Sequence, residues 1–98
     1  MSRNVVVRYR THPEAADENA RLVEAVFAEL AEVDPGNFHY ATYRLDDGVT
    51  FVHVARIEGE NPLATLAAFA EFQRDIAGRC AEPPAPSGAT LVGSYGEA

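Results

Sequence analysis

The middle of the chain has the pattern of a β-hairpin, and this pattern limits the possible folds more than any other feature. Two runs rich in β-branched and aromatic residues, 38–45 and 49–57, flank the turn Asp46-Asp47-Gly48. A three-residue loop that ends in glycine is typical of a type I turn closed by a glycine bulge. We therefore expect two antiparallel strands joined through this loop.

The length of the loop decides which side chains share a face of the hairpin. With a three-residue loop, residue 45 faces 49, 43 faces 51, 41 faces 53 and 39 faces 55. One face would then carry His39, Ala41, Tyr43, Leu45, Val49, Phe51, His53 and Ala55. A two-residue turn would shift the register by one residue and scramble these sets.

A helical pattern precedes the hairpin. Apolar residues recur at three- and four-residue spacing over residues 13–33. Thr11 and Glu14 have the spacing of a capping box, in which each side chain bonds an unpaired backbone amide of the other. Asp34-Pro35-Gly36 predicts the end of this helix.

A second helical pattern follows the hairpin. Asn61 is predicted as its N-cap and Pro62 as its first residue, because the N–H that proline lacks would be unbonded there. Apolar residues continue at helical spacing as far as Gly78, a plausible stop. The second helix is therefore expected over about residues 62–78.

The remaining segments complete a β-α-β-β-α-β order. Residues 5–10 are predicted as the first strand, the proline-rich residues 82–87 as a stiff loop, and residues 89–95 as the last strand. This order predicts an α+β, ferredoxin-like fold, in which two helices cover one face of a four-stranded antiparallel sheet. Association of two sheets face to face, in an isologous dimer, would bury the other face.

Composition narrows the class of protein. The formal net charge of −7 disfavours binding to nucleic acid or to an anionic membrane surface. Hydrophobic residues make up 47% of the chain, a generous share for one small domain, which favours burial against a partner copy. The lone Cys80 cannot form an internal disulfide, no apolar run is of spanning length, and we expect no signal peptide. We expect a cytoplasmic protein with a single domain, residues 1–98.

Several segments taken together carry a family resemblance. They are Val5–Arg10, Pro13-Glu14, Thr50–Arg56, and Asn61-Pro62 followed by Leu66, Phe69 and Phe72. In these segments the chain resembles the antibiotic biosynthesis monooxygenase (ABM)-like family of dimeric α/β barrels. The resemblance implies βαββαβ protomers that join into a barrel, with a pocket between the sheet and the helices.

The same resemblance sets expectations about activity. Some members of the family oxygenate phenolic polyketides without metal or flavin, whereas others open haem, isomerise small molecules or have no known activity. The chain departs from the family pattern at Ile57, where a tryptophan is frequent, and at about Phe72, where a histidine is common. The resemblance therefore supports the fold more strongly than it supports any one reaction.

Side chains that could transfer protons gather on the hairpin. We predict His53 as the proton-transfer group and Tyr43 and His39 as its orienting partners, because an imidazole titrates near neutral pH and a phenol can donate to a substrate oxygen. The alternative is that both histidines are partly buried residues of the sheet. A His53 that is sealed by packing could not act as the base.

Substrate contacts are predicted for Phe51, Arg56, Asn61 and Phe72. Arg56 could bind a carboxylate, although such arginines more often pair with acidic residues. Asn61 could bond a carbonyl, although it fits a helix cap better, and Phe72 has the spacing of a core residue. No metal-site spacing or dinucleotide fingerprint is present, so neither a metal nor a cofactor is predicted.

Two functions remain open. One is a cofactor-independent monooxygenase-like activity on a small aromatic or enolic metabolite, in which a base deprotonates a phenol or enol and oxygen attacks the resulting carbanion. The other is a non-catalytic dimeric barrel that binds a small hydrophobic ligand or serves as an assembly module. Both predict a homodimer that forms through sheet faces, and they differ in whether His53→Ala changes turnover.

Overall fold

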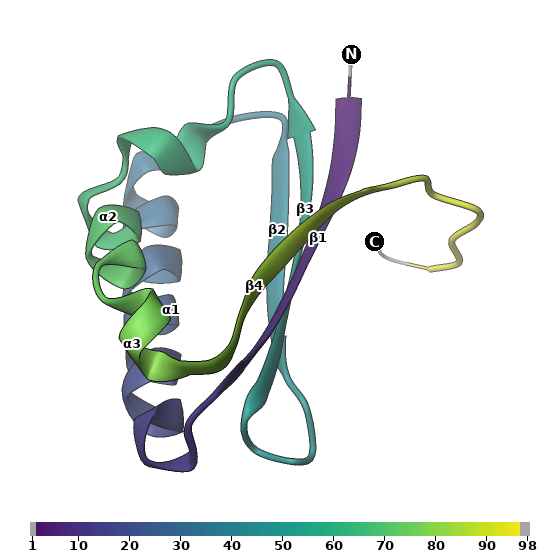
Figure 1. Ribbon diagram of the computed structural model, residues 1–98. Helices are drawn as coiled ribbons and strands as arrows, with labels where there is room; N and C mark the ends of the chain where they lie inside the picture. The colour runs from purple at the N-terminus through teal and green to yellow at the C-terminus, as the bar shows by residue number, and fades with distance from the viewer. Residues whose placement is uncertain (1, 97–98) are drawn as a thin grey trace.

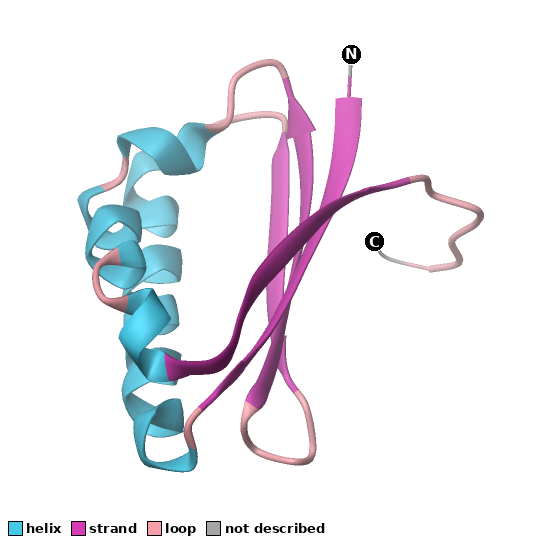
Figure 2. Cartoon of the chain, viewed as in Figure 1, coloured by secondary structure: helices cyan, strands magenta, loops and turns pink. Residues whose placement is uncertain are grey.

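The chain folds into two layers, a four-stranded antiparallel sheet and a layer of helices on one face of it (Figures 1 and 2). The computed structural model describes residues 2–96. The strands are β1 (Ser2–Thr11), β2 (Phe38–Arg44), β3 (Thr50–Glu58) and β4 (Cys80–Ala89), in the spatial order β2-β3-β1-β4. The helices are α1 (Ala16–Val33), α2 (Ala67–Gln73) and α3 (Ile76–Arg79), with 3₁₀ turns η1 (Pro13–Ala15) and η2 (Pro62–Thr65). The predicted α+β, ferredoxin-like fold is confirmed.

The core lies between the two layers and is rich in aromatic rings. Alternate residues of β1 and β3 point toward the helices, so that Tyr9 and Phe51 stack with their ring centroids 5.6 Å apart. Val23 and Val26 of α1 and Phe72 of α2 pack into the same cluster. Each large apolar side chain in such a core contributes roughly 1.5–3 kcal/mol by leaving water. Helix packing against one sheet face thus holds the fold together.

The β2–β3 hairpin has a four-residue loop, 46–49, where a three-residue loop was predicted. The Leu45 amide donates to the Thr50 carbonyl at 2.8 Å. The Asp47 carboxylate accepts hydrogen bonds from the amides of Val49 and Thr50 at 3.0 and 2.9 Å, and another from the Thr50 hydroxyl. Asp47 thereby holds Val49 inside the loop, which moves the first cross-strand pair by one residue.

This shift exchanges the two faces of β2. Thr42 pairs with His53, and Tyr40 pairs with Ala55. Side chains of even number in β2 therefore face the helices together with His53, while His39 and Tyr43 lie on the outer face. The prediction that His39, Tyr43 and His53 share one face was wrong.

The first helix ends as predicted but begins differently. Thr11 closes β1, and its hydroxyl donates to the Val49 carbonyl at 3.4 Å, so the predicted capping box with Glu14 was wrong. A 3₁₀ turn that starts at Pro13 leads into α1. Asp34 adopts a left-handed conformation with φ of 51°, and its amide bonds the Leu30 carbonyl to end the helix.

The second helical region is interrupted, where one continuous helix was predicted. The Asn61 side chain accepts a hydrogen bond from the Leu63 amide at 3.0 Å, which confirms its capping role, but it caps the short turn η2. The chain is extended at Leu66, and α2 restarts with the Ala68 amide bonded to the Glu29 carboxylate of α1 at 2.8 Å. This partner lies 39 residues away, so periodicity alone could not reveal it.

The predictions for the C-terminal loop and for the last strand were both wrong. The proline-rich residues 82–87, predicted as a loop, belong to β4, and of residues 89–95, predicted as the last strand, all but Ala89 lie outside the sheet. β4 is an edge strand, where prolines are tolerated because the outward amides need no partner strand. Beyond Ala89 the chain turns away from the sheet (Figure 1).

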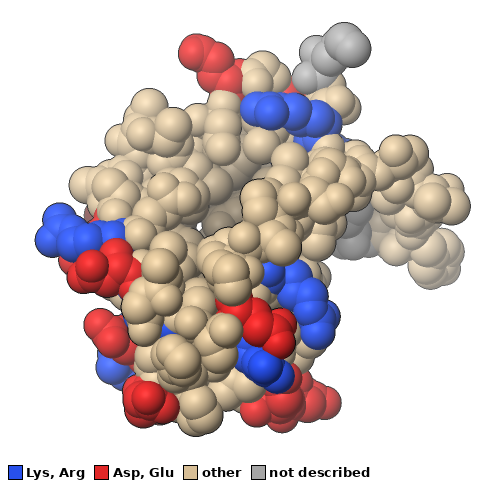
Figure 3. Space-filling view, in the orientation of Figure 1, with Lys and Arg blue, Asp and Glu red and all other residues tan. Residues whose placement is uncertain are grey.

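Much of one face of the molecule carries no charged side chains. In Figure 3, red and blue residues lie mainly around the lower end and the outer edges, and uncharged residues surround an opening between the helical layer and the sheet. Within residues 2–96, no helix is both long and apolar enough to cross a membrane.

Candidate functional site

The imidazole of His53 lies in the core beneath the helices and has three hydroxyl partners. The Tyr9 hydroxyl lies 2.8 Å from Nε2, and the Tyr40 and Thr42 hydroxyls lie 2.6 and 3.0 Å from Nδ1. The three partners come from β1 and β2, the strands on either side of β3. His53 is only 4% exposed. Three neighbouring strands therefore fix the ring within a closed polar cluster.

This cluster continues into the helical layer. Asn19 of α1 donates from Nδ2 to the Tyr9 hydroxyl at 2.9 Å, and its Oδ1 accepts from Nε of Arg79 at 3.2 Å. The other nitrogens of Arg79 donate to the carbonyls of Phe72 and Arg74 at the end of α2. We call Arg79, Asn19, Tyr9, His53, Tyr40 and Thr42 the polar chain.

Burial keeps His53, Tyr40 and Tyr9 of the polar chain uncharged. Burial lowers the pKa of His53 from 6.5 to about 4, so its imidazole is neutral at pH 7. Burial raises the pKa of Tyr40 to about 12, against a smaller opposite effect from its hydrogen bond with Thr42. Burial also raises the pKa of Tyr9. The guanidinium of Arg79 is thus the charged group of the chain.

Two hollows open between α1 and β2, beside the polar chain. One has a volume of about 190 Å³ and is lined by Thr42, Phe51 and residues of α1, and the other, of about 300 Å³, is lined by Phe38, Tyr40 and residues of α1. Phe27 borders both hollows and stacks on Tyr40 at 5.1 Å. We call the two hollows together the α1–β2 groove.

Two residues that hold the imidazole of His53 also line the groove, whereas His53 itself does not. Tyr40 and Thr42 line the groove, and both hold Nδ1 of the imidazole. His53 lines neither hollow of the groove. Tyr40 and Thr42 are therefore the residues that connect the groove with the imidazole.

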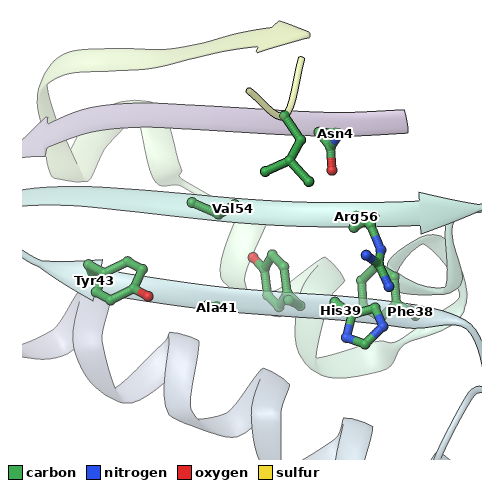
Figure 4. A pocket seen from close by; sticks show the side chains of 9 residues that line it. Asn4, Phe38, His39, Ala41, Tyr43, Val54 and Arg56 are labelled. Carbon is green, nitrogen blue, oxygen red and sulfur yellow. The ribbon is translucent and has the colours of Figure 1, made fainter. Parts of the chain in front are cut away.

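A third hollow, of about 530 Å³, lies over the outer face of the sheet. Figure 4 shows Arg56, His39 and Asn4 toward one end of it and Tyr43 toward the other. Nε of Arg56 is buried and has no hydrogen-bond partner among residues 2–96. His39, Tyr43 and Arg56 thus gather on this face, away from the polar chain.

The remaining predicted contact residues occupy other places. Phe51 and Phe72 are buried in the core, at 2% and 5% exposure, although Phe51 also borders the groove. Asn61 caps η2. The seven predicted residues are therefore divided among the core, the outer hollow and a helix cap.

Sequence reasoning missed the partners that His53 does have. Tyr40 and Thr42 would have been found with the correct hairpin register, which places them on the same face as His53. Asn19 left a visible signal, because it is a polar residue among the apolar positions Ala16, Val23 and Val26 of α1. Arg79 left no such signal.

The chemistry that this site can perform is hydrogen bonding and proton movement. Its groups are an imidazole and three hydroxyls, held at 2.6 to 3.0 Å. Within residues 2–96, no three His, Cys, Asp or Glu side chains are placed so that they could hold a metal ion together.

Known protein structures share this fold at low sequence identity. A Mycobacterium tuberculosis protein, Rv0793, matches with a TM-score of 0.75 and 16% identity, over 98% of this chain and 100% of that one. SnoaB from Streptomyces nogalater, described as a cofactor-independent oxygenase, matches in a variant form with a TM-score of 0.69 and 15% identity, over 98% of each chain. The chain matches no family model and no curated protein sequence.

A further match bears the family description itself. A Nitrosomonas europaea protein, provisionally described as an antibiotic biosynthesis monooxygenase, has a TM-score of 0.75 and 14% identity, over 97% of this chain and 94% of that one. At such identities the likeness concerns the backbone. The chain therefore has the antibiotic biosynthesis monooxygenase-like fold.

Proposed function

We propose that this protein binds a small aromatic or enolic metabolite in the α1–β2 groove and acts on it as a cofactor-independent monooxygenase. One observation carries the proposal: a buried neutral imidazole is bonded to the hydroxyls of two residues, Tyr40 and Thr42, that line an aromatic groove. The solved structures of the same fold include one described as a cofactor-independent oxygenase, which supports the same reaction class.

The low pKa of His53 shapes its part in such a reaction. A substrate phenol or enol must lose its proton before oxygen can attack the ring or the enol carbon. An imidazole with a pKa of about 4 is a poor acceptor for a full proton at pH 7. We therefore expect the substrate proton to pass to solvent water, and we place the contribution of His53 in hydrogen bonding through Tyr40 and Thr42, which would stabilise the negative oxygen left on the substrate.

Oxygen uptake with a panel of phenols and quinols tests this function. Tyr40→Phe and Thr42→Val each remove one hydroxyl from the groove, and we expect each to lower kcat/KM by about tenfold or more. Tyr95→Phe is the matched control, because Tyr95 is fully exposed in the C-terminal segment. Unchanged turnover in both groove variants would show that Tyr40 and Thr42 take no part in the reaction.

A second function rests on the closed environment of His53. A ring that is 4% exposed and held on both nitrogens also suits a structural role. The protein would then bind a hydrophobic ligand in the groove without turnover or serve as an assembly module. Calorimetric binding of a panel member that causes no oxygen uptake would favour this reading.

We also propose that two copies associate through their outer sheet faces. The helices of residues 2–96 all lie on the other face (Figure 1). Tyr43 and Val54 of the outer face are 59% and 38% exposed, and Leu91 beside them is 61% exposed. A second copy would remove these apolar side chains from water.

A further inference from the structure

The hydrogen bonds of the polar chain can run in only one direction from Arg79 to Tyr9. A guanidinium has donors and no acceptor, so the Asn19 atom that faces Arg79 must be its oxygen. The amide nitrogen of Asn19 then faces Tyr9 and donates to the Tyr9 oxygen at 2.9 Å. Arg79 thus fixes the orientation of Asn19, and Asn19 makes Tyr9 an acceptor.

The direction continues from Tyr9 to His53. Tyr9 is 2% exposed, and its own hydrogen has one remaining partner among residues 2–96, Nε2 of His53 at 2.8 Å. A hydroxyl hydrogen without an acceptor costs more at the buried Tyr9 than at Tyr40 or Thr42, which are half-buried and line the groove, so Tyr9 donates to Nε2. A neutral imidazole that accepts at Nε2 carries its proton on Nδ1. The polar chain therefore selects the Nδ1–H tautomer of His53.

This tautomer leaves one hydrogen unused beside the groove. Nδ1, Tyr40 and Thr42 together carry three hydrogens, and only the two hydroxyl oxygens can accept them. Nδ1–H bonds one oxygen, and a single hydrogen can lie between the two hydroxyls. The third hydrogen, on Tyr40 or Thr42, has no acceptor within the cluster. With the opposite tautomer, Nδ1 would accept and both hydroxyl hydrogens of this pair would be used, but the hydrogen of Tyr9 would then lack an acceptor.

We propose that the Tyr40–Thr42 pair presents a hydrogen-bond donor to the α1–β2 groove, so that the group bound there is an accepting oxygen, such as a carbonyl or an enolate. The groove as the ligand site is taken from the proposed function, and the donor character comes from the polar chain. Asn19 and Arg79 are positioning residues in this arrangement. They touch no ligand and act by setting the tautomer of His53.

The tautomer of His53 is measurable without any ligand. A long-range ¹H–¹⁵N correlation spectrum at pH 7, with His53 assigned by its loss in His53→Gln, distinguishes a protonated ring nitrogen from an unprotonated one. We expect Nδ1 to be protonated and Nε2 to be unprotonated. A spectrum with the proton on Nε2 would overturn the inference, whether or not the protein turns over a substrate.

Asn19→Asp should reverse the direction of the hydrogen bonds between residue 19, Tyr9 and His53. Aspartate has nearly the same shape as asparagine, so the packing should change little. The new carboxylate accepts from both Arg79 and the Tyr9 hydroxyl, so that Tyr9 must accept from Nε2–H of His53. We expect the two ring nitrogens to exchange their ¹⁵N shifts. Asn37→Asp makes the same change at an exposed site and should leave the spectrum of His53 unaltered. An Asn19→Asp protein that folds and keeps the original tautomer contradicts the positioning role.

Binding of 1-tetralone and tetralin tests the donor directly, because these ligands differ by one carbonyl oxygen. We expect the double variant Tyr40→Phe/Thr42→Val to weaken binding of 1-tetralone by about three- to tenfold and to leave tetralin unaffected. Equal effects on both ligands, or none on 1-tetralone, would contradict the donor. Binding without oxygen uptake would instead count against the proposed reaction alone.

Discussion

Nε of Arg79 lies 3.2 Å from Oδ1 of Asn19, a residue 60 positions earlier in the chain, and both side chains are almost fully buried. Arg79 forms no ion pair with a carboxylate of residues 2–96. Its charge is instead satisfied by the carbonyls of Phe72 and Arg74 and by the ring of Phe72, 5.5 Å away. One cation thus joins α1 to the end of α2 and begins the polar chain.

Replacing this cation should cost much of the protein's stability. Arg79→Met leaves three acceptors without this donor, two of them in buried hydrogen bonds, and we expect it to lower the free energy of unfolding by about 2–4 kcal/mol. Arg74→Met is the control, because Arg74 is exposed and its pair with Glu71 is a surface pair worth under about 1 kcal/mol. Urea unfolding of both variants measures the difference. Equal losses of unfolding free energy in the two variants would show that the hydrogen bonds of Arg79 contribute no more than a surface ion pair.

Acidification should destabilise the protein through His53. The pKa of the folded state, about 4, lies below the ordinary value of 6.5, so between these values the unfolded chain binds the proton more tightly. The stabilisation that comes from a neutral His53 is therefore fully present above pH 6.5. It is lost as the pH falls toward 4, by about 3 kcal/mol in all. Unfolding midpoints of the wild type and His53→Gln, measured from pH 7.5 to 4, should converge as the pH falls. Parallel curves would contradict a buried neutral imidazole.

The fold could be predicted because its strands, helices and turns have local signals. The strand around Phe51, the helix ended by Asp34 and the cap at Asn61 each follow from neighbouring residues. The proline-rich strand β4 was missed because proline is tolerated there only at an edge, and an edge position is a property of the whole sheet. Its prolines therefore predicted a loop.

The candidate site was harder to predict because it depends on one turn and on distant contacts. The Asp47 carboxylate sets the loop length, and this one-residue difference replaces Tyr43 and His39 with Tyr40 and Thr42 beside His53. Asn19 and Arg79 reach the site from two different helices. His53, predicted as the proton-transfer group, lies at the centre of these hydrogen bonds, and its catalytic role stays a prediction.

The turn that sets the register can be tested at Asp47. Hydrogen bonds from Thr50 and Val49 lower the pKa of its carboxyl from 3.8 to about 2, so their stabilisation is present above pH 3.8 and is lost as the pH falls toward 2. We expect Asp47→Ala to lower the urea midpoint at pH 7. Asp46→Ala, one residue earlier and exposed, should leave it nearly unchanged. Equal midpoints for the two variants would mean that the loop does not depend on this carboxylate.

The outer face of the sheet is expected to join two copies of the protein. If two copies join through it, sedimentation at micromolar concentration should show a particle of twice the 10.6 kDa chain mass. Val54→Arg places a charge at the centre of this face and should shift the protein toward monomer, because an unpaired charge in an apolar interface is strongly unfavourable. Val33→Arg makes the same change at an exposed position at the end of α1 and should leave the dimer intact. A monomeric wild type, or a dimer that tolerates Val54→Arg, would contradict this mode of pairing.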